Sequence, residues 1–228
     1  MKSQDKHFHV IYVKELFFEV VSKYVSNPKI VEKLFQQVVK AYSAPGRHYH
    51  DMNHLYGVVS MWNDHKHLLK DADAIFLAAI YHDIVYNPKR NDNELKSWYF
   101  FHNKISFQFN PYGNNDIFLM TQKIFKAILA TKHNEESKKF WEDDKDIQYL
   151  LDFDLEILGT RHESTYEWYR KGVRKEYSIY PLKAYKVGRK AVLESFLKRK
   201  EIYLTPEFKK IEKRARKNLN NEIKSYLC

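Results

Sequence analysis

The chain of 228 residues is poor in cysteine, glycine and proline. A single cysteine, Cys228, excludes an internal disulfide framework and suits a reducing compartment, so we expect a cytoplasmic protein. Six glycines and six prolines are too few for the many tight turns of an all-β protein. The longest apolar run, 74–81, is far shorter than the ~20 residues of a membrane span, and no apolar segment typical of a secretory signal follows the first charges. We therefore expect no membrane partner.

Positive charge is in excess, with a formal net charge of +10, and it is unevenly distributed. Residues 160–228 hold 19 Lys and Arg against 8 Asp and Glu, whereas the residues before them hold 20 against 21. This asymmetry indicates an anionic partner, such as a phosphorylated small molecule, a nucleic acid or a membrane surface. On composition alone, a solvated, lysine-rich face that keeps the protein soluble is the simpler interpretation.

Hydrophobic residues recur at three- and four-residue steps, which predicts amphipathic helices and an all-α fold. We expect one domain over 1–228: a compact multi-helix bundle with its core at about 28–159, and basic helices of about 160–228 packed on it. Loops are expected at 43–47, 87–92, 109–115 and 132–144. The predicted helices span 12–25, 28–43, 50–63, 71–86, 92–106, 115–132, 145–158, 162–179, 182–199 and 206–227.

Several polar residues occupy positions where this pattern calls for apolar ones. The residues three and four positions either side of His82 and Asp83 are largely apolar, so on a helix both side chains would face the core. The same test predicts a buried Asp154, with Asp152 nearer the surface. His50 and His54 are four residues apart and would share one helical face, with His54 the deeper.

An ionised carboxylate on an apolar face is costly unless a cation or several donors compensate it. A divalent metal ion would satisfy imidazole and carboxylate ligands from separate helices at once. Two histidines and two carboxylates suit Mn, Fe, Co, Ni, Zn or Mg. For any one histidine alone, a hydrogen-bonded core residue is the simpler interpretation.

The order of a histidine, an adjacent His-Asp pair and a distant aspartate resembles the HD superfamily of metal-dependent phosphohydrolases. Further segments resemble a bacterial branch of that superfamily known only as predicted metal-dependent phosphohydrolases: "RHYH…H" (47–54), "YHDIVYNPKRNDNE" (81–94), "ILATKH" (128–133), "LDFDLEILG" (151–159), "VRKEY" (173–177), "GRKAVLESFLKR" (188–199) and "ARKNLNNEI" (215–223). A departure is "NELKSW" (93–98), where a second acidic residue and a small residue are expected. The resemblance implies an HD-like helical fold and the metal ligands His54, His82, Asp83 and Asp154.

The resemblance also implies a reaction, the hydrolysis of a phosphate ester, plausibly of a nucleotide. "YHDMNH" resembles the histidine segment of cyclic-nucleotide phosphodiesterases, which makes His50 the expected general acid. Asp83 would orient or deprotonate the attacking water. Glu94 is a second candidate base or a partner of a ligand histidine, or else the third residue of a capping box that Asn91 begins.

The phosphate-binding side of the pocket is expected from cationic and phenolic residues. His133 is a candidate substrate contact or second-metal ligand, although His133 and Lys132 would also suit a helix C-terminus electrostatically. The candidates are His133, Lys132, Arg174, Tyr177, Arg189 and Arg216.

Two other functions compete with hydrolysis. A basic helical surface with 17 tyrosines could bind nucleic acid by stacking, although no nucleic-acid motif is present and the aspartates on apolar faces stay unexplained. An HD-type di-iron oxygenase would need extra ligands, which His50 and His133 could supply. The sequence does not specify the oligomeric state.

Overall fold

The computed structural model describes residues 3–109 and 115–226, and within them the secondary structure is entirely helical. The predicted all-α class is confirmed. The α-helices are α1 (Ser3–Val21), α2 (Pro28–Tyr42), α3 (Met52–His65), α4 (Ala72–Tyr81), α5 (Asn93–Lys104), α6 (Asn115–Ala130), α7 (Lys145–Leu155), α8 (Glu163–Glu176), α9 (Leu182–Lys198), α10 (Pro206–Lys209) and α11 (Glu212–Lys224). The 3-10 helices are η1 (Lys66–Leu68), η2 (Ser106–Phe109), η3 (Glu135–Phe140) and η4 (Glu156–Gly159).

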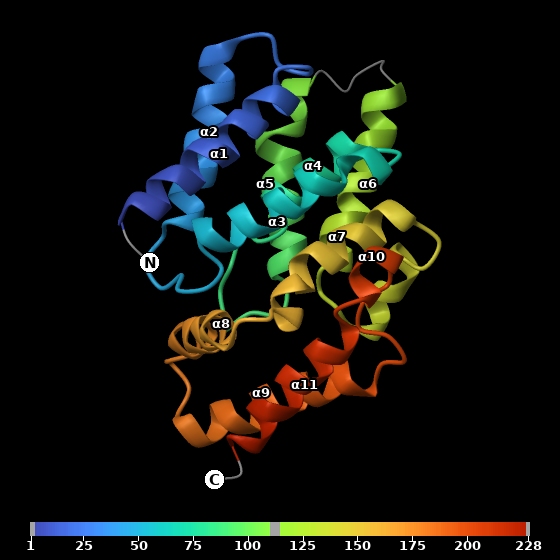
Figure 1. Ribbon diagram of the computed structural model, residues 1–228. Helices are drawn as coiled ribbons and strands as arrows, with labels where there is room; N and C mark the ends of the chain where they lie inside the picture. The colour runs from blue at the N-terminus through green and yellow to red at the C-terminus, as the bar shows by residue number, and fades with distance from the viewer. Residues whose placement is uncertain (1–2, 110–114, 227–228) are drawn as a thin grey trace.

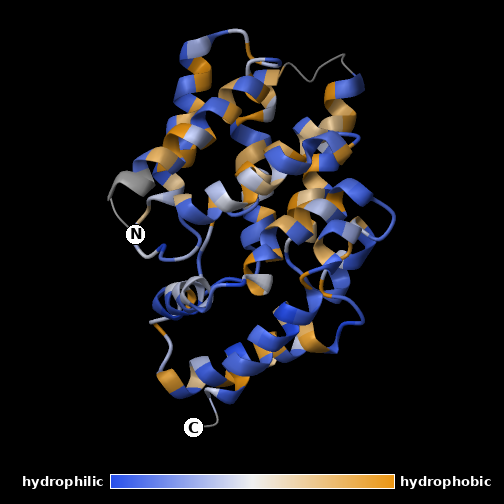
Figure 2. Cartoon of the chain, in the orientation of Figure 1, coloured by the Kyte–Doolittle hydropathy of each residue, from blue (hydrophilic) through white to orange (hydrophobic). Residues whose placement is uncertain are grey.

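The helices form an upper bundle and a lower layer (Figure 1). In the bundle, α1 packs on α2 and α3, while α4 contacts α3, α5, α6 and α7. The lower layer contains α8, α9 and α11, and both α8 and α11 contact η4, which directly follows α7. A single cluster of buried apolar residues extends from Val13 in α1 to Leu219 in α11, so both parts share a continuous core. Hydrophilic residues cover much of α8 and α11 (Figure 2).

Helix α4 occupies the centre of the bundle. Every residue from Ala74 to Tyr81 is buried, as expected of a helix that is apolar on all sides. Among the described residues, no helix combines the length and hydropathy that a membrane span requires.

The C-terminus of α4 differs from the prediction of a helix over 71–86. Tyr42 Oη in α2 donates a hydrogen bond to the carbonyl oxygen of Ile80 at 3.0 Å, and His82 Nδ1 contacts the carbonyl oxygen of Ala79 at 2.8 Å. These contacts satisfy carbonyl groups that have no partner at a helix end, and α4 stops at Tyr81. Asp83 therefore lies in a turn, where its carboxylate is not confined to one helical face.

Helix α3 begins later than the predicted 50–63. Asp51 is its N-cap, and its carboxylate accepts a hydrogen bond from the backbone nitrogen of Asn53 at 2.8 Å. His50 thus precedes the helix instead of sharing a face with His54.

The last predicted helix also needs revision. The predicted helix 206–227 is two helices, α10 and α11. Most of the predicted loop at 109–115, the last residue of that helix prediction and Cys228 lie outside the described residues.

Helix α8 approaches the segment before α3 very closely at Gly172. A Cβ atom at this position would lie 2.8 Å from the carbonyl oxygen of His48 and 2.9 Å from the Cβ of Tyr49. Only glycine permits this approach without displacing backbone. The contact brings the C-terminal end of α8 against the start of α3.

Candidate metal centre

Three segments of the upper bundle bring imidazole and carboxylate groups together. His54 from the first turn of α3, His82 from the end of α4 and Asp154 from the last turn of α7 offer ligand atoms that all lie within 4.8 Å of one another. His54 and His82 are buried. This cluster could hold a metal ion.

The distances in the cluster match the spacing of ligands around one cation. His54 Nε2 lies 3.4 Å from His82 Nε2 and 3.3 Å from Asp154 Oδ1, and His82 Nε2 lies 3.7 Å from the same oxygen. Two ligand atoms bonded at about 2.1 Å to a tetrahedral ion are about 3.4 Å apart. The arrangement therefore fits a divalent ion without a large rearrangement.

The hydrogen bond between His82 Nδ1 and the carbonyl oxygen of Ala79 decides how this ring faces the cluster. The ring nitrogen must donate to the carbonyl, so in the neutral imidazole the lone pair is on Nε2, which points at His54 and Asp154. Backbone carbonyls commonly orient metal-binding histidines in this way.

Asp83 lies beside both histidines. Its Oδ2 is 3.3 Å from His82 Nε2, 3.9 Å from His54 Nε2 and 3.9 Å from His50 Nε2. Burial alone would raise the pKa of Asp83, but the imidazoles of His82 and His50 lower it below its ordinary value. The pKa of Asp154 is also lowered despite burial, chiefly by hydrogen bonds from His133 and His54. Both carboxylates are thus held ionised by the histidines around them.

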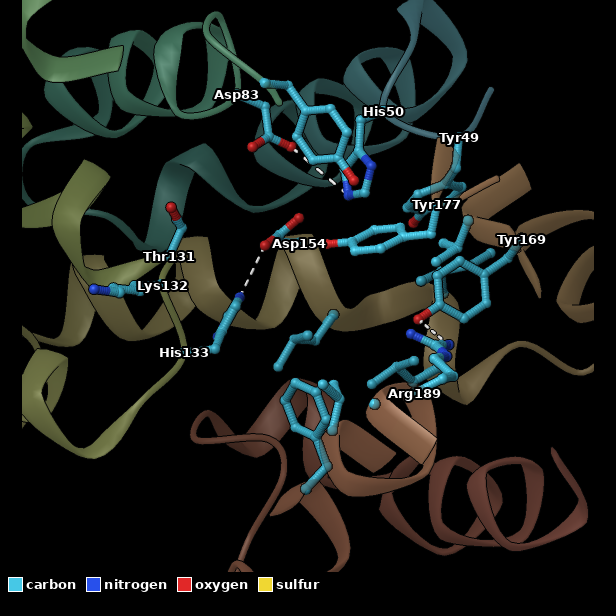
Figure 3. Close-up of a pocket in the computed structure, with 18 of the residues that line it drawn as sticks. Tyr49, His50, Asp83, Thr131, Lys132, His133, Asp154, Tyr169, Tyr177 and Arg189 are labelled. Atoms are coloured by element: carbon cyan, nitrogen blue, oxygen red, sulfur yellow. Dashed lines mark hydrogen bonds and ion pairs between the residues drawn. The ribbon is translucent and has the colours of Figure 1, made fainter. Parts of the chain in front are cut away.

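His50 lies next to the cluster of His54, His82 and Asp154, and its ring is held in place by Glu176. His50 Nδ1 is 2.7 Å from Glu176 Oε2, while Nε2 faces Asp83. Burial would lower the pKa of His50, but the nearby Asp83 and Glu176 carboxylates raise it above its ordinary value. His50 can therefore carry a proton on Nε2 toward the space that Asp83 and Asp154 border (Figure 3).

Glu176 was not among the residues singled out from the sequence. Its Oε1 accepts hydrogen bonds from the backbone nitrogens of His48, Tyr49 and His50, at 2.8, 2.8 and 2.9 Å. Burial opposes ionisation, yet the hydrogen bond from His50 and those from the backbone lower the pKa of Glu176 to about 2. The helical test used for Asp154 would have revealed it, because the residues three and four positions either side are Gly172, Val173, Ile179 and Tyr180.

Asp152 is a correction to the sequence analysis, which placed it nearer the surface than Asp154. Asp152 is 0% exposed, whereas the Asp154 side chain is 15% exposed. The Asp152 carboxylate accepts hydrogen bonds from the backbone nitrogens of Leu204 and Thr205 and from Thr205 Oγ1. Asp152 joins α7 to the segment before α10 and is not one of the candidate metal-binding residues.

His133 reaches the centre from the end of α6 through an uncommon backbone conformation. Its φ is 53°, in the left-handed region that residues other than glycine rarely adopt. The imidazole Nε2 lies 2.8 Å from Asp154 Oδ2, and Arg199 donates a hydrogen bond to the His133 carbonyl oxygen. The contacts of its side chain and of its carbonyl group hold His133 next to Asp154, a candidate metal ligand. Strained backbone conformations of this kind are common at functional sites.

Glu94 and Lys132 line the same cavity. Burial, with a smaller effect of Asp83, raises the pKa of the Glu94 carboxyl above its ordinary value. The capping-box interpretation of Glu94 is wrong, because the N-cap of α5 is Asp92 instead of Asn91 and makes no side-chain capping bond.

The cavity next to the candidate metal-binding residues has a volume of about 530 Å³, within the usual range for small-molecule sites. His50, Asp83, Asp154 and His133 border one end of it (Figure 3). Of the residues predicted to bind phosphate, Lys132, His133, Tyr177 and Arg189 line it.

Arg174 and Arg216 are not among the lining residues. Arg174 hydrogen-bonds the carbonyl oxygens of Tyr177 and Tyr180 and lies over the ring of Tyr185. Arg216 pairs with Glu212 at 2.6 Å and hydrogen-bonds the carbonyl oxygens of residues 197, 199 and 200. Both arginines hold together the lower layer.

Comparison of the chain with protein-family models, with curated proteins and with solved structures finds no match in any of the three.

Proposed function

We propose that the protein hydrolyses a phosphate ester with the help of a divalent metal ion held by His54, His82, Asp83 and Asp154. The observation that carries the proposal is the convergence of these side chains from three segments, with His82, Asp83 and Asp154 lining a cavity. When bound, such an ion lowers the pKa of a coordinated water and polarises a phosphoryl oxygen.

His50 is proposed to protonate the leaving oxygen. Its Nδ1 is taken up by Glu176, so Nε2 is the nitrogen available on the cavity side. The Asp83 and Glu176 carboxylates raise the pKa of His50 above its ordinary value, which favours the protonated ring that a general acid requires.

The other polar residues of the cavity orient water and substrate. Asp83 and Glu94 are the candidate acceptors for a proton from water, and both lie at the metal-proximal end. The side-chain nitrogens of Lys132 and His133, which line the cavity, are the candidate contacts for the phosphoryl oxygens.

The test is a hydrolysis screen of purified protein with Mn, Fe, Co, Ni, Zn or Mg. Its substrates are nucleoside mono-, di- and triphosphates, cyclic nucleotides and sugar phosphates. We expect phosphate release with at least one metal, its abolition in Asp83→Ala and His82→Ala, and a loss of about 10²- to 10⁴-fold in kcat in His50→Gln. His67→Ala, which alters an exposed histidine, is the matched control. Wild-type activity in Asp83→Ala would contradict the proposal.

The two alternative functions make different predictions in the same preparation. A nucleic-acid-binding module would bind oligonucleotides with an affinity that falls steeply with salt and would not depend on Asp83. A di-iron oxygenase would contain two iron ions per chain and would consume oxygen.

A further inference from the structure

Large apolar side chains are exposed together around the corner between α8 and α9. Five of them fall within residues 179–192 and are between 38% and 66% exposed: Ile179, Tyr180, Leu182, Val187 and Val192. Figure 2 shows hydrophobic residues at this corner, at the lower left. Single exposed apolar residues are normal on a protein surface, whereas a group of them marks a contact surface.

Helix α9 is apolar on two sides. Its buried side holds Tyr185, Leu193 and Phe196. Its exposed side carries apolar or small residues at steps of three and four: Ala184, Val187, Gly188, Ala191, Val192 and Ser195. One apolar side is enough to hold a helix on a protein, so the second is available to a partner. We name the exposed side of α9, together with residues 179–182, the docking face.

Positive charge borders the docking face. No aspartate or glutamate occurs from Tyr177 to Leu193. Three lysines follow one another at steps of three and four beside Val187: Lys183, Lys186 and Lys190. Lys190 pairs with Glu194 at 3.7 Å. The docking face therefore combines apolar side chains with lysines along one edge, and it suits an anionic partner.

The docking face also borders the cavity. Tyr180, Ala184, Gly188 and Val192 line the cavity, and all four are exposed. The cavity therefore reaches the protein surface beside α9. A partner that covers α9 would lie next to this opening.

Anionic lipid headgroups fit the docking face best. Helices that lie on a membrane surface have an apolar side with lysines or arginines beside it. Each lysine near an anionic lipid surface strengthens binding about fivefold. Tyr180 and Leu182 flank Pro181 at the exposed corner, and tyrosine is enriched where headgroups meet acyl chains.

A second copy of the chain fits the docking face less well. Two such faces in contact would bring lysines toward lysines, and each copy carries a net charge of +10. Like charges across an interface oppose association. An anionic surface meets the same lysines with the opposite sign.

We propose that the docking face binds the protein to a membrane surface that contains anionic lipids, with the opening of the cavity beside the headgroups. The expectation of no membrane partner came from the lack of a long apolar run and of a secretory signal, and a helix that lies on the surface needs neither. The inference does not depend on the proposed reaction, because it rests on the exposed residues of α9 and of the corner before it.

Co-sedimentation of the purified protein with lipid vesicles tests the inference. Vesicles of phosphatidylcholine alone are compared with vesicles of phosphatidylcholine mixed with phosphatidylserine. We expect roughly tenfold stronger binding to the mixed vesicles, weakened by added salt. Leu182→Gln combined with Val187→Gln should lower the affinity roughly tenfold. Lys183→Gln combined with Lys186→Gln should lower it about twentyfold.

Two double variants elsewhere on the surface are the matched controls. Phe118→Gln with Leu119→Gln alters apolar side chains of α6 that are 54% and 57% exposed. Lys29→Gln with Lys33→Gln removes two exposed lysines of α2. Both should bind the mixed vesicles as wild type does. A loss in either control equal to the loss in its docking-face counterpart would overturn the inference.

Sedimentation velocity without vesicles separates a membrane from a second copy. We expect a monomer in wild type. A dimer that Leu182→Gln with Val187→Gln dissociates would assign the docking face to a second copy and overturn the inference. Wild type that binds neither kind of vesicle would overturn it too, and would leave another protein as the partner.

Discussion

Asp152 and Asp154 lie two positions apart on α7, and their carboxylates have different partners. Asp152 accepts hydrogen bonds from Leu204 and Thr205, whereas Asp154 faces His54, His82 and His133. The first holds two parts of the chain together, and the second belongs to the candidate metal centre. The contacts of these two aspartates on one helix therefore assign a different role to each.

This difference gives a paired prediction. Asp152→Ala leaves buried backbone donors without an acceptor and should lower the free energy of unfolding by about 3 kcal/mol. It should retain the rise in Tm that a bound metal produces. Asp154→Ala should lose that metal-dependent rise. Thermal melts of both variants, with and without metal, check this; a metal-dependent rise in Asp154→Ala would remove this residue from the ligand set.

His133 supplies a second prediction at the scale of one residue, because its left-handed backbone is strained for any side chain except glycine. Both His133→Gly and His133→Ala lose the contact with Asp154, so their difference isolates the backbone. Denaturant unfolding should find the glycine variant more stable than the alanine variant by about 1 kcal/mol. Equal stability would mean that the backbone relaxes in the variants.

At the scale of elements, α8 supports the site through close packing. Gly172 allows α8 to lie against His48 and Tyr49, and one turn later Glu176 accepts hydrogen bonds from three backbone nitrogens and His50. The orientation of the proposed general acid thus depends on a helix more than 120 residues away in the sequence.

Two helical glycines should respond in opposite directions to the same change. Gly172→Ala forces the added methyl group against backbone and should lower the free energy of unfolding by about 1–3 kcal/mol. Gly188→Ala enters empty space and should raise it by up to about 1 kcal/mol through helix propensity. Chemical denaturation of both variants measures this. Stabilisation by Gly172→Ala would show that α8 can shift away from the start of α3 at no cost.

The sequence predicted which segments form helices better than it predicted where those helices begin and end. Apolar spacing located the helices because it reflects which face is buried. The end of α4 depends on the hydroxyl of Tyr42, which lies 38 residues before the carbonyl it binds, and no local pattern reports this. The same limit applies to Asp152, whose donors come from residues 204 and 205, and to Arg189, whose partner Glu222 neutralises it.

At the scale of the whole molecule, the upper bundle supplies His50, Asp83 and Asp154 at one end of the cavity, and α8 and α9 of the lower layer supply many of its other lining residues. The His and Asp candidates could be predicted because polar residues on apolar faces are conspicuous in a sequence. The role of the basic last third could not, because Arg174, Arg189 and Arg216 are taken up by carbonyl groups and by Glu222 and Glu212. Net charge gave no information about where charge is available.

The central claim is that side chains from α3, from the end of α4 and from α7 bind one divalent ion. Calorimetric titration of metal-free protein with Mn, Ni or Zn tests it most directly, in wild type, His82→Ala and the exposed-histidine control His67→Ala. We expect about one ion per chain in wild type and in His67→Ala, and no binding at this site in His82→Ala. The absence of binding in wild type, or equal binding in His82→Ala, would contradict the account.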